Sequence, residues 1–360
     1  HNGRWEHFDS RARYYFEQID LMDDSQLNGG AADVTQTNNT VDGQVSGYLG
    51  DHLLTSGAEL RKTELEHSRN IANGSVDATQ SAVYLQDEFG FGDLALTLSG
   101  RLDHHETYGT EFSPRAYALY TLTDEWVIKG GAGKAFKAPT LAQSSEGFST
   151  TACRGACQVI GNPDLKPETA VSYELGTAYE AARFGAGVTG FHNEIEDLIQ
   201  SDQWGPGYRP TVMTYLNVKE ARIKGLELTG WVDVLDNVTL TGNFTLLDSV
   251  DRSTGDDLAK TPDHTGNLGL DWQASELVSA NLAWQYVGSQ VIKVPARNSQ
   301  AFTSKHYQTL DVNTNWTVTP ALDFKLGITN LTNTQRDEVA TDADFILEGR
   351  TVYAGVDYKL

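Results

Sequence analysis

The two cysteines of the chain, Cys153 and Cys157, are the residues whose type and spacing most directly suggest chemistry. They lie within a stretch from Pro139 to Gly176 that is rich in Ser, Thr, Gly and Pro and too polar to form a core. Two thiols separated by three residues in such a loop suit a small disulfide in an oxidising compartment. The alternative is a metal pair, but no further His or Cys lies nearby to complete a site. We predict a Cys153–Cys157 disulfide.

A second group of candidates consists of basic and aromatic side chains in the stretches that we expect to be long loops. These residues are Phe148, Arg154, Trp204, Tyr208, Arg209, Lys293, Arg297 and Arg336. Charged groups and rings together can bind a ligand that is anionic and aromatic. Each of them, taken singly, is also an ordinary residue of a loop surface.

The sequence predicts no catalytic site, no cofactor and no metal site. His104, His105 and Glu106 are adjacent, but neighbours on a strand point to opposite faces and cannot converge on one metal ion. No serine lies in a GxSxG nucleophile elbow, which disfavours a hydrolase. We therefore expect that the chain is not an enzyme.

Composition excludes several classes of protein. Hydrophobic residues make up 39% of the chain and the mean hydropathy is −0.40. Because no long apolar run exists, transmembrane helices are excluded, whereas a barrel that uses alternate residues for lipid is not. The formal net charge of −22 argues against nucleic acid as a partner, so an anionic ligand would need a local basic patch.

Alternation of apolar and polar residues extends over most of the chain. Leu94, Leu96 and Leu98 point one way, for example, while Thr97 and Ser99 point the other. Strands are predicted over residues 11–19, 45–49, 53–65, 82–89, 94–103, 115–123, 126–136, 171–179, 184–198, 215–234, 238–246, 278–286, 310–318, 322–329 and 352–360, with a polar loop through residues 29–40. We count about sixteen strands plus a stub at residues 1–6, within the range of membrane barrels.

The connections favour an antiparallel transmembrane β-barrel over a soluble sandwich. Turns of two to four residues alternate with loops of about ten to thirty residues, as periplasmic turns and extracellular loops do in bacterial barrels. A sandwich with Greek-key connections shows no such alternation.

Six segments carry a resemblance to a known family. They read GKAFKAPT from Gly133, GNPDLKPETAVSYELG up to Gly176, NVKEARIKGLEL from Asn217, KTPDH from Lys260, GITNLTN from Gly327 and EGRTVYAGVDYKL at the end. In this order they resemble TonB-dependent outer-membrane receptors over roughly the last two thirds of the chain. The cysteine-bearing loop is most similar to the branch of ferric-enterobactin and colicin receptors.

The resemblance implies a barrel of about 22 strands with a plug domain inside it. Residues 1–360 are then expected to be the C-terminal part of the barrel, and the plug and first strands are expected to lie outside this chain. The implied location is the bacterial outer membrane. The implied function is active import of a ferric siderophore of the catecholate type. The resemblance implies that TonB energises this import through the plug.

The resemblance also implies partners. Besides the siderophore and the TonB complex, these are the lipid bilayer, lipopolysaccharide, and a colicin or phage. The alternatives are a passive porin or adhesin, or a receptor for haem, cobalamin or another metal chelate.

Two carboxylates, Glu174 and Glu227, match the YELG and GLE motifs of the family. Alternation places both on the polar side of their strands, because Tyr173 and Leu175 flank one and Leu226 and Leu228 flank the other. The resemblance implies that both face the lumen and contact plug arginines. A carboxylate at membrane depth is costly unless it is paired.

Overall fold

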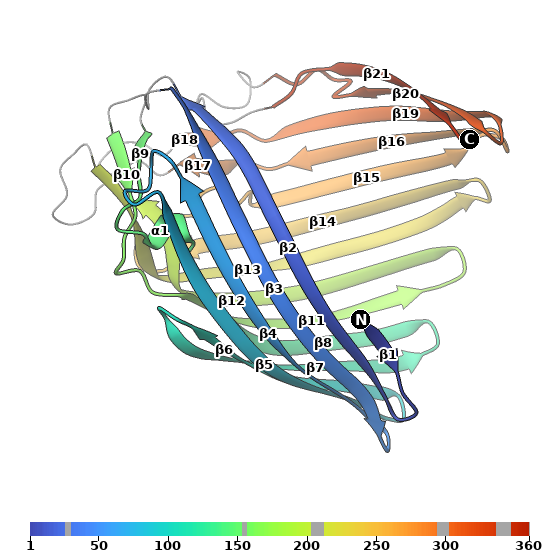
Figure 1. Cartoon of the computed structure of the whole chain (residues 1–360). Helices are drawn as coiled ribbons and strands as arrows, with labels where there is room; N and C mark the ends of the chain where they lie inside the picture. The colour runs from blue at the N-terminus through green and yellow to red at the C-terminus, as the bar shows by residue number, and fades with distance from the viewer. Residues whose placement is uncertain (26–29, 153–156, 203–211, 294–301, 336–346, 360) are drawn as a thin grey trace. The chain divides into compact units, whose positions relative to one another are not determined.

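The computed structural model describes residues 1–25, 30–152, 157–202, 212–293, 302–335 and 347–359. Regular structure in these ranges is almost entirely β-strand, as Figure 1 shows. Nineteen strands belong to one sheet, while β17 (Gln290–Lys293) and β18 (Phe302–Ser304) pair in a second sheet. A short helix, α1, covers Leu141–Ser144. The predicted all-β fold is confirmed.

Helices in the described ranges are too short and too polar to cross a membrane.

The chain divides into two compact units. Unit 1 consists of residues 1–120, 130–173 and 193–221, and unit 2 of residues 121–129, 174–192 and 222–360. Unit 1 contains β1 (Asn2–Arg4), β2 (Phe8–Ser25), β3 (Gly30–Leu49), β4 (His52–His67), β5 (Ser75–Phe91), β6 (Leu94–His105), β9 (Ser149–Ala152) and β10 (Cys157–Ile160). Unit 2 contains β14 (Val238–Asp251), β15 (His264–Gln273), β16 (Val278–Val287), β19 (Tyr307–Thr319), β20 (Leu322–Thr329) and β21 (Thr351–Tyr358). The strands with residues in both units are β7 (Gly109–Thr123), β8 (Trp126–Lys137), β11 (Glu168–Glu180), β12 (Phe184–Asp202) and β13 (Val212–Leu235).

Within each unit the long strands pair antiparallel with their neighbours in the chain. In unit 1 the pairs run from β2 through β7, and in unit 2 from β14 through β15, β16, β19 and β20 to β21. Counting only strands of eight residues or more, the described ranges contain sixteen, in agreement with the number expected from the sequence.

Two expectations about individual strands were wrong. The segment predicted as a polar loop at residues 29–40 is the first half of β3 from Gly30 onward. Its polar residues are compatible with a strand because they bond across to β2, as Thr35 does to Asp20 at 2.8 Å and Asn38 does to Glu17 at 2.9 Å. The strand β15 was not predicted at all.

The connections are short at one end of the strands and vary in length at the other, from the three residues between β6 and β7 to residues 138–167 between β8 and β11. The expected strict alternation of short turns with loops of ten residues or more is therefore wrong at the connection between β6 and β7. Tight turns follow β3, β5, β7, β13, β15 and β19, and Gly50 and Gly92 take left-handed φ values of 65° and 57° at two of them. We call this end of each strand the turn end and the opposite end the loop end. In bacterial barrels the long loops are extracellular.

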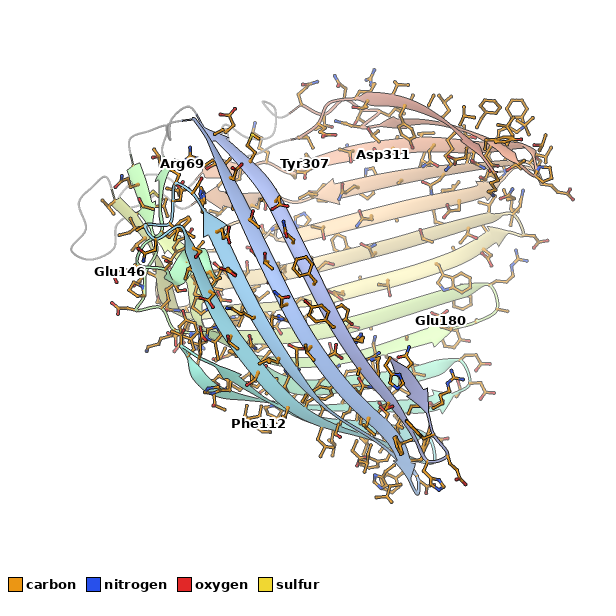
Figure 2. The ribbon with its side chains drawn as sticks, in the orientation of Figure 1. Arg69, Phe112, Glu146, Glu180, Tyr307 and Asp311 are labelled. Atoms are coloured by element: carbon orange, nitrogen blue, oxygen red, sulfur yellow. The ribbon has the colours of Figure 1, made fainter. Side chains whose placement is uncertain are left out.

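Side chains project from both faces of the strands (Figure 2), and the two faces differ in chemistry. In unit 1 one face carries Arg13, Asp42 and Asp103, of which the two carboxylates are only 7% and 3% exposed. The opposite face carries Tyr14 and Leu85, which are 64% and 56% exposed. We call these the polar face and the apolar face. Large apolar side chains exposed in such numbers require a lipid or protein partner.

The apolar face of unit 2 has aromatic side chains near both ends. Phe244 and Tyr286 lie toward the loop end, and Trp316 packs on Phe324 toward the turn end with ring centroids 6.1 Å apart. Trp316 pairs with Val278, eight residues from Tyr286 along β16. That separation is about 26 Å along the strand, or about 20 Å of height at the usual tilt, close to the apolar band of about 25 Å between aromatic girdles.

Candidate functional site

A cavity of about 710 Å³ lies on the polar face of unit 1 at the loop end. Its wall includes Gln36, Arg61, Thr63, His67, Gln80 and His105. Arg61 of β4 lies opposite Gln80 of β5, and Gln80 lies opposite His105 of β6. Because directly opposed residues share a face, the sheet register alone brings these groups together.

The other side of the cavity comes from the connection between β8 and β11, residues 138–167, which we call the central loop. Phe136, Lys137 and the residues of 138–142 line it, and α1 begins within this segment. The helix is held by a capping box, in which the Gln143 backbone N–H donates to Thr140 Oγ1 at 3.3 Å and the Thr140 N–H donates to Gln143 Oε1 at 2.9 Å.

Phe148 also lines the cavity, and it anchors the loop in unit 1. The ring is 9% exposed, and Phe148 forms a β-bridge with Ile71, which is 4% exposed. Next to it the Ser149 N–H donates to the Asn70 carbonyl at 2.8 Å, and the Ala72 N–H donates to the Gly147 carbonyl at 3.1 Å. The central loop is therefore joined to the connection between β4 and β5.

Motif residues hold the far side of the central loop. Asn217 accepts a hydrogen bond from the Lys166 N–H at 2.9 Å and donates to the carbonyls of Lys166 and Asp197 at 2.9 and 2.6 Å. Asn162 donates to the Tyr215 carbonyl at 2.8 Å. The GNPDLKPE and NVKEAR segments are thus cross-linked by side-chain amides, which gives both motifs a structural role.

Glu168 is the buried charge of this region. Its side chain is 11% exposed, one oxygen accepts from the Ile199 N–H at 2.8 Å, and the other pairs with Lys137 Nζ at 3.2 Å. A buried carboxylate needs such partners to offset desolvation. Glu168 therefore ties the start of β11 to β12 and to the end of β8.

Most polar groups of the cavity already have protein partners. His67 Nε2 bonds Asn70 Nδ2 at 2.8 Å, His105 Nδ1 accepts from the Thr107 N–H at 3.2 Å, and Gln80 donates to Asp103 at 3.0 Å. The two cations are also paired, Arg61 with Glu59 at 3.3 Å and Lys137 with Glu168 at 3.2 Å, but their side chains are 48% and 63% accessible. Described His, Cys, Asp and Glu residues form no group that could hold a metal ion. The arrangement suits binding of an anion with aromatic character.

Of the ligand residues predicted from the sequence, only Phe148 has a described side chain. Lys293 ends β17, and only its backbone is described. Arg154, Trp204, Tyr208, Arg209, Arg297 and Arg336 lie outside the described residues. Cys157 begins β10 and is disulfide-bonded, whereas Cys153 lies outside the described residues, so the Cys153–Cys157 pairing stays a prediction.

Glu174 and Glu227 are both exposed, each between two exposed apolar neighbours on its strand. The alternation of β11 and β13 thus separates them from the apolar face, while their contact with a plug stays a prediction. His104 and His105 lie on opposite faces of β6, His104 beside Thr110 and His105 against the Tyr108 ring, which is tilted by 39° from it.

The sequence did not point to Gln36, Arg61, Gln80 or Lys137 as site residues. For Arg61 the sequence offered one signal, because alternation places this residue on the same face of its strand as Glu59. That β3 to β6 meet the central loop depends on contacts more than a hundred residues apart in places, and a single sequence carries no signal of that kind.

The family description "TonB dependent receptor-like, beta-barrel" matches residues 1–331. The chain belongs to this family. The receptor is similar to the iron-regulated outer membrane virulence protein of Vibrio cholerae, at 29% identity with 86% of this chain and 49% of that protein covered. It is also 29% identical to the ferrienterobactin receptor of Escherichia coli K12, with 90% of this chain and 47% of that protein covered.

A solved structure shows the same fold. The ferric enterobactin receptor of Pseudomonas aeruginosa, crystallised as a mutant in complex with enterobactin, superposes with a TM-score of 0.86 at 23% identity, covering 99% of this chain and 61% of that chain. The chain spans about half the length of the curated relatives it matches. The family consists of outer-membrane receptors rather than enzymes, so the predicted family, location and absence of catalysis are confirmed.

Proposed function

We propose that this chain is the C-terminal part of the barrel of a receptor that imports ferric siderophores, with the catecholate type as its substrate class. The observation that carries the proposal is the cavity of unit 1, which combines the exposed cations Arg61 and Lys137 with the rings of Phe136 and Phe148. A ferric catecholate complex is anionic and aromatic, so it uses both kinds of group. The volume of about 710 Å³ lies within the range of small-molecule sites.

The relatives support the same class of ligand. Two of them are named for enterobactin, and enterobactin is bound in the solved complex. The net charge of −22 repels an anion at long range, so capture must come from local cations. Arg61 and the loop residues Arg154, Trp204 and Arg209 are our candidates, with Tyr208, Lys293, Arg297 and Arg336 as further contacts.

The test is quenching of tryptophan fluorescence in the full-length receptor by ferric catecholate, ferric hydroxamate, haem and cobalamin. We expect the ferric catecholate to bind most tightly. Arg61→Ala should weaken its affinity about ten- to hundredfold, as loss of one charged contact does. Lys62→Ala is the matched control, because Lys62 is the next residue on the same strand but points to the opposite face.

Three outcomes contradict the proposal. Tighter binding of haem, cobalamin or a hydroxamate would change the substrate class. Equal loss of affinity in Lys62→Ala and Arg61→Ala would show that the cavity does not take part in recognition of the siderophore. Unselective passage of solutes through the full-length protein in liposomes, without ligand binding, would indicate a porin.

Energising by TonB needs a plug, for which we propose Glu174 and Glu227 as contacts. In the full-length receptor, Glu174→Gln combined with Glu227→Gln should loosen the plug and slow siderophore uptake. Unchanged uptake and an unchanged plug in the double variant would count against this role while leaving siderophore binding intact.

A further inference from the structure

One buried imidazole, that of His67 at the end of β4, caps the connection between β4 and β5. The side chain of His67 is 7% exposed. Its Nδ1 atom accepts from the backbone N–H groups of Arg69 and Asn70, whose nitrogens lie 3.5 and 3.4 Å away. Its Nε2 atom lies 2.8 Å from Nδ2 of Asn70. The ring therefore holds the first turn of the connection, as an Asn or Asp side chain does in an Asx turn.

These contacts require a neutral ring. A neutral imidazole keeps one nitrogen as a hydrogen-bond acceptor, whereas an imidazolium donates from both nitrogens. A proton on Nδ1 of His67 would face the backbone N–H groups of Arg69 and Asn70. Turning the Asn70 side chain would not relieve this conflict, because the two donors belong to the backbone. Protonation of His67 therefore breaks the cap.

Asn70 connects the cap to the central loop. Asn70 is buried, its side chain contacts the imidazole of His67, and its carbonyl accepts from the Ser149 N–H at 2.8 Å. The next residue, Ile71, forms the β-bridge to Phe148, whose ring lines the cavity. The position of Phe148 at the cavity thus depends on a turn that His67 holds.

The charged groups around His67 come from β2, from its own connection and from the cavity. Asp23 Oδ2 on β2 lies 3.9 Å from Nε2 of His67, and the same oxygen pairs with Arg69 Nη2 at 2.6 Å. Arg69 is labelled in Figure 2. Three further groups line the cavity together with His67, and they are Arg61, His105 and Lys137. The one nearby carboxylate is therefore shared with a guanidinium, and the cavity side is cationic.

These surroundings favour the neutral ring. His67 lies in the loop-end part of the sheet, opposite Val34. Burial lowers the pKa of His67 from its ordinary value of 6.5, Asp23 opposes this shift, and Arg69 adds to it. A ring released into water regains the ordinary pKa, so it binds a proton more readily than the buried ring. The cap is therefore complete above about pH 6.5 and weakens as the pH falls below that value.

We propose that neutral His67 is a positioning residue that holds the central loop against the siderophore cavity, and that protonation of His67 releases the loop. In acid the cavity then loses its contact with the ring of Phe148, and an anionic aromatic ligand binds more weakly. The identity of the ligand rests on the proposed function. Release of the loop does not.

The first test is hydrogen exchange of the full-length receptor without ligand, measured by mass spectrometry on peptides that contain Ser149. The unchanged receptor is compared with His67→Asn at the same pH, so that the intrinsic pH dependence of exchange cancels. Asn keeps an acceptor near the position of Nδ1 but cannot be protonated. We expect equal protection at about pH 7.5, and up to about tenfold weaker protection of the unchanged receptor at about pH 5.5.

Two further variants complete this test. His104→Gln is the matched control, because His104 is exposed on the opposite face of β6 and should leave protection at both pH values unchanged. His67→Ala should lose protection at both. The same pH dependence in His67→Asn and in the unchanged receptor would overturn the proposal. So would loss of protection in His67→Asn at both pH values, because the ring and not its acceptor would then hold the loop.

The second test is the affinity for a ferric catecholate, measured by quenching of tryptophan fluorescence at the same two pH values. Comparing the unchanged receptor with His67→Asn at each pH cancels proton uptake by the ligand itself. We expect equal affinities at about pH 7.5 and up to about tenfold weaker binding by the unchanged receptor at about pH 5.5. Tighter binding by the unchanged receptor in acid would mean that the imidazolium attracts the anion, and would overturn the proposal. Release of the loop in a receptor that binds no ferric catecholate would refute the proposed function and support the role of His67.

Discussion

Units 1 and 2 share one alternation of apolar and polar residues but stabilise their polar faces differently. In unit 1 the polar face carries ion pairs, such as Arg13 with Asp42 at 3.0 Å and Arg101 with Asp103 at 3.0 Å. In unit 2 it carries a chain of amides, in which Asn313 donates to Asn281 at 3.2 Å and Asn281 donates to Asp271 at 2.8 Å. Alternation along the strand fixes which face a residue occupies. The residues opposite it on neighbouring strands decide whether it forms an ion pair or an amide hydrogen bond.

The apolar faces differ as well where they meet the loops. In unit 1, Glu64 lies opposite Asp77, and Lys62 bonds Asp77 at 3.0 Å. In unit 2, Arg222 and Lys224 both pair with one carboxylate, that of Asp248. The net charges of these two clusters therefore differ in sign.

The largest effect on stability is expected from breaking the charged network of unit 1. Arg101→Ala would leave Asp103, whose side chain is 4% exposed, without its principal partner, although Gln80 still donates to it. We expect a loss of about 3–5 kcal/mol in the free energy of unfolding. Urea unfolding of the receptor in lipid vesicles, followed by tryptophan fluorescence, measures it.

Lys134→Ala is the control for that variant, because the Lys134–Glu111 pair at 3.3 Å is more exposed. It should cost less than about 1 kcal/mol. Equal costs for the two variants would mean that burial of the ion pair is unimportant.

A smaller loss is expected where unit 2 depends on close backbone approach. A methyl group at Gly225 would lie 2.4 Å from the Leu246 carbonyl oxygen and 2.6 Å from the Phe191 ring. Gly225→Ala should therefore destabilise by about 1–3 kcal/mol in the same unfolding measurement. Gly43→Ala on β3 meets nothing within 4 Å and should be neutral or slightly stabilising. A neutral Gly225→Ala would refute the tight approach.

The amide chain of unit 2 should contribute less to the free energy of unfolding than the ion pairs of unit 1. Asn281→Ala removes one donor to Asp271 and one acceptor for Asn313, and we expect a loss of about 1–2 kcal/mol. A loss as large as that of Arg101→Ala would erase the difference between the two polar faces. Urea titrations of both variants, run in parallel, compare them directly.

The smallest effect is expected at the exposed pair of unit 1. Lys62 and Asp77 are 54% and 51% accessible, so their attraction is screened. Lys62→Gln should change the free energy of unfolding by less than about 0.5 kcal/mol, and added salt should not alter the result. A larger, salt-dependent loss would show that Lys62 holds the carboxylates of this surface together.

Much of the fold could be predicted from the sequence. Alternation and turn residues located most strands, because membrane barrels impose a period of two over whole strands and tight turns between them. The segment at residues 29–40 was mistaken for a loop because its Thr, Asn and Gln residues do not alternate with apolar ones. Beyond the apolar band, a strand has no lipid to face, so apolar and polar residues no longer alternate. The hydrogen-bonded pairing of this segment with β2 nevertheless continues.

The sequence by itself determined the family, the faces of the strands and the position of the central loop, because motifs, periodicity and prolines are local properties of the chain. Only the tertiary structure decided that Arg61 of β4 and Phe148 of the central loop line one cavity. It likewise decided that His264 stacks on Tyr286 while Arg222 and Lys224 share Asp248. These groupings depend on strand register and on packing between distant segments, which no local pattern encodes.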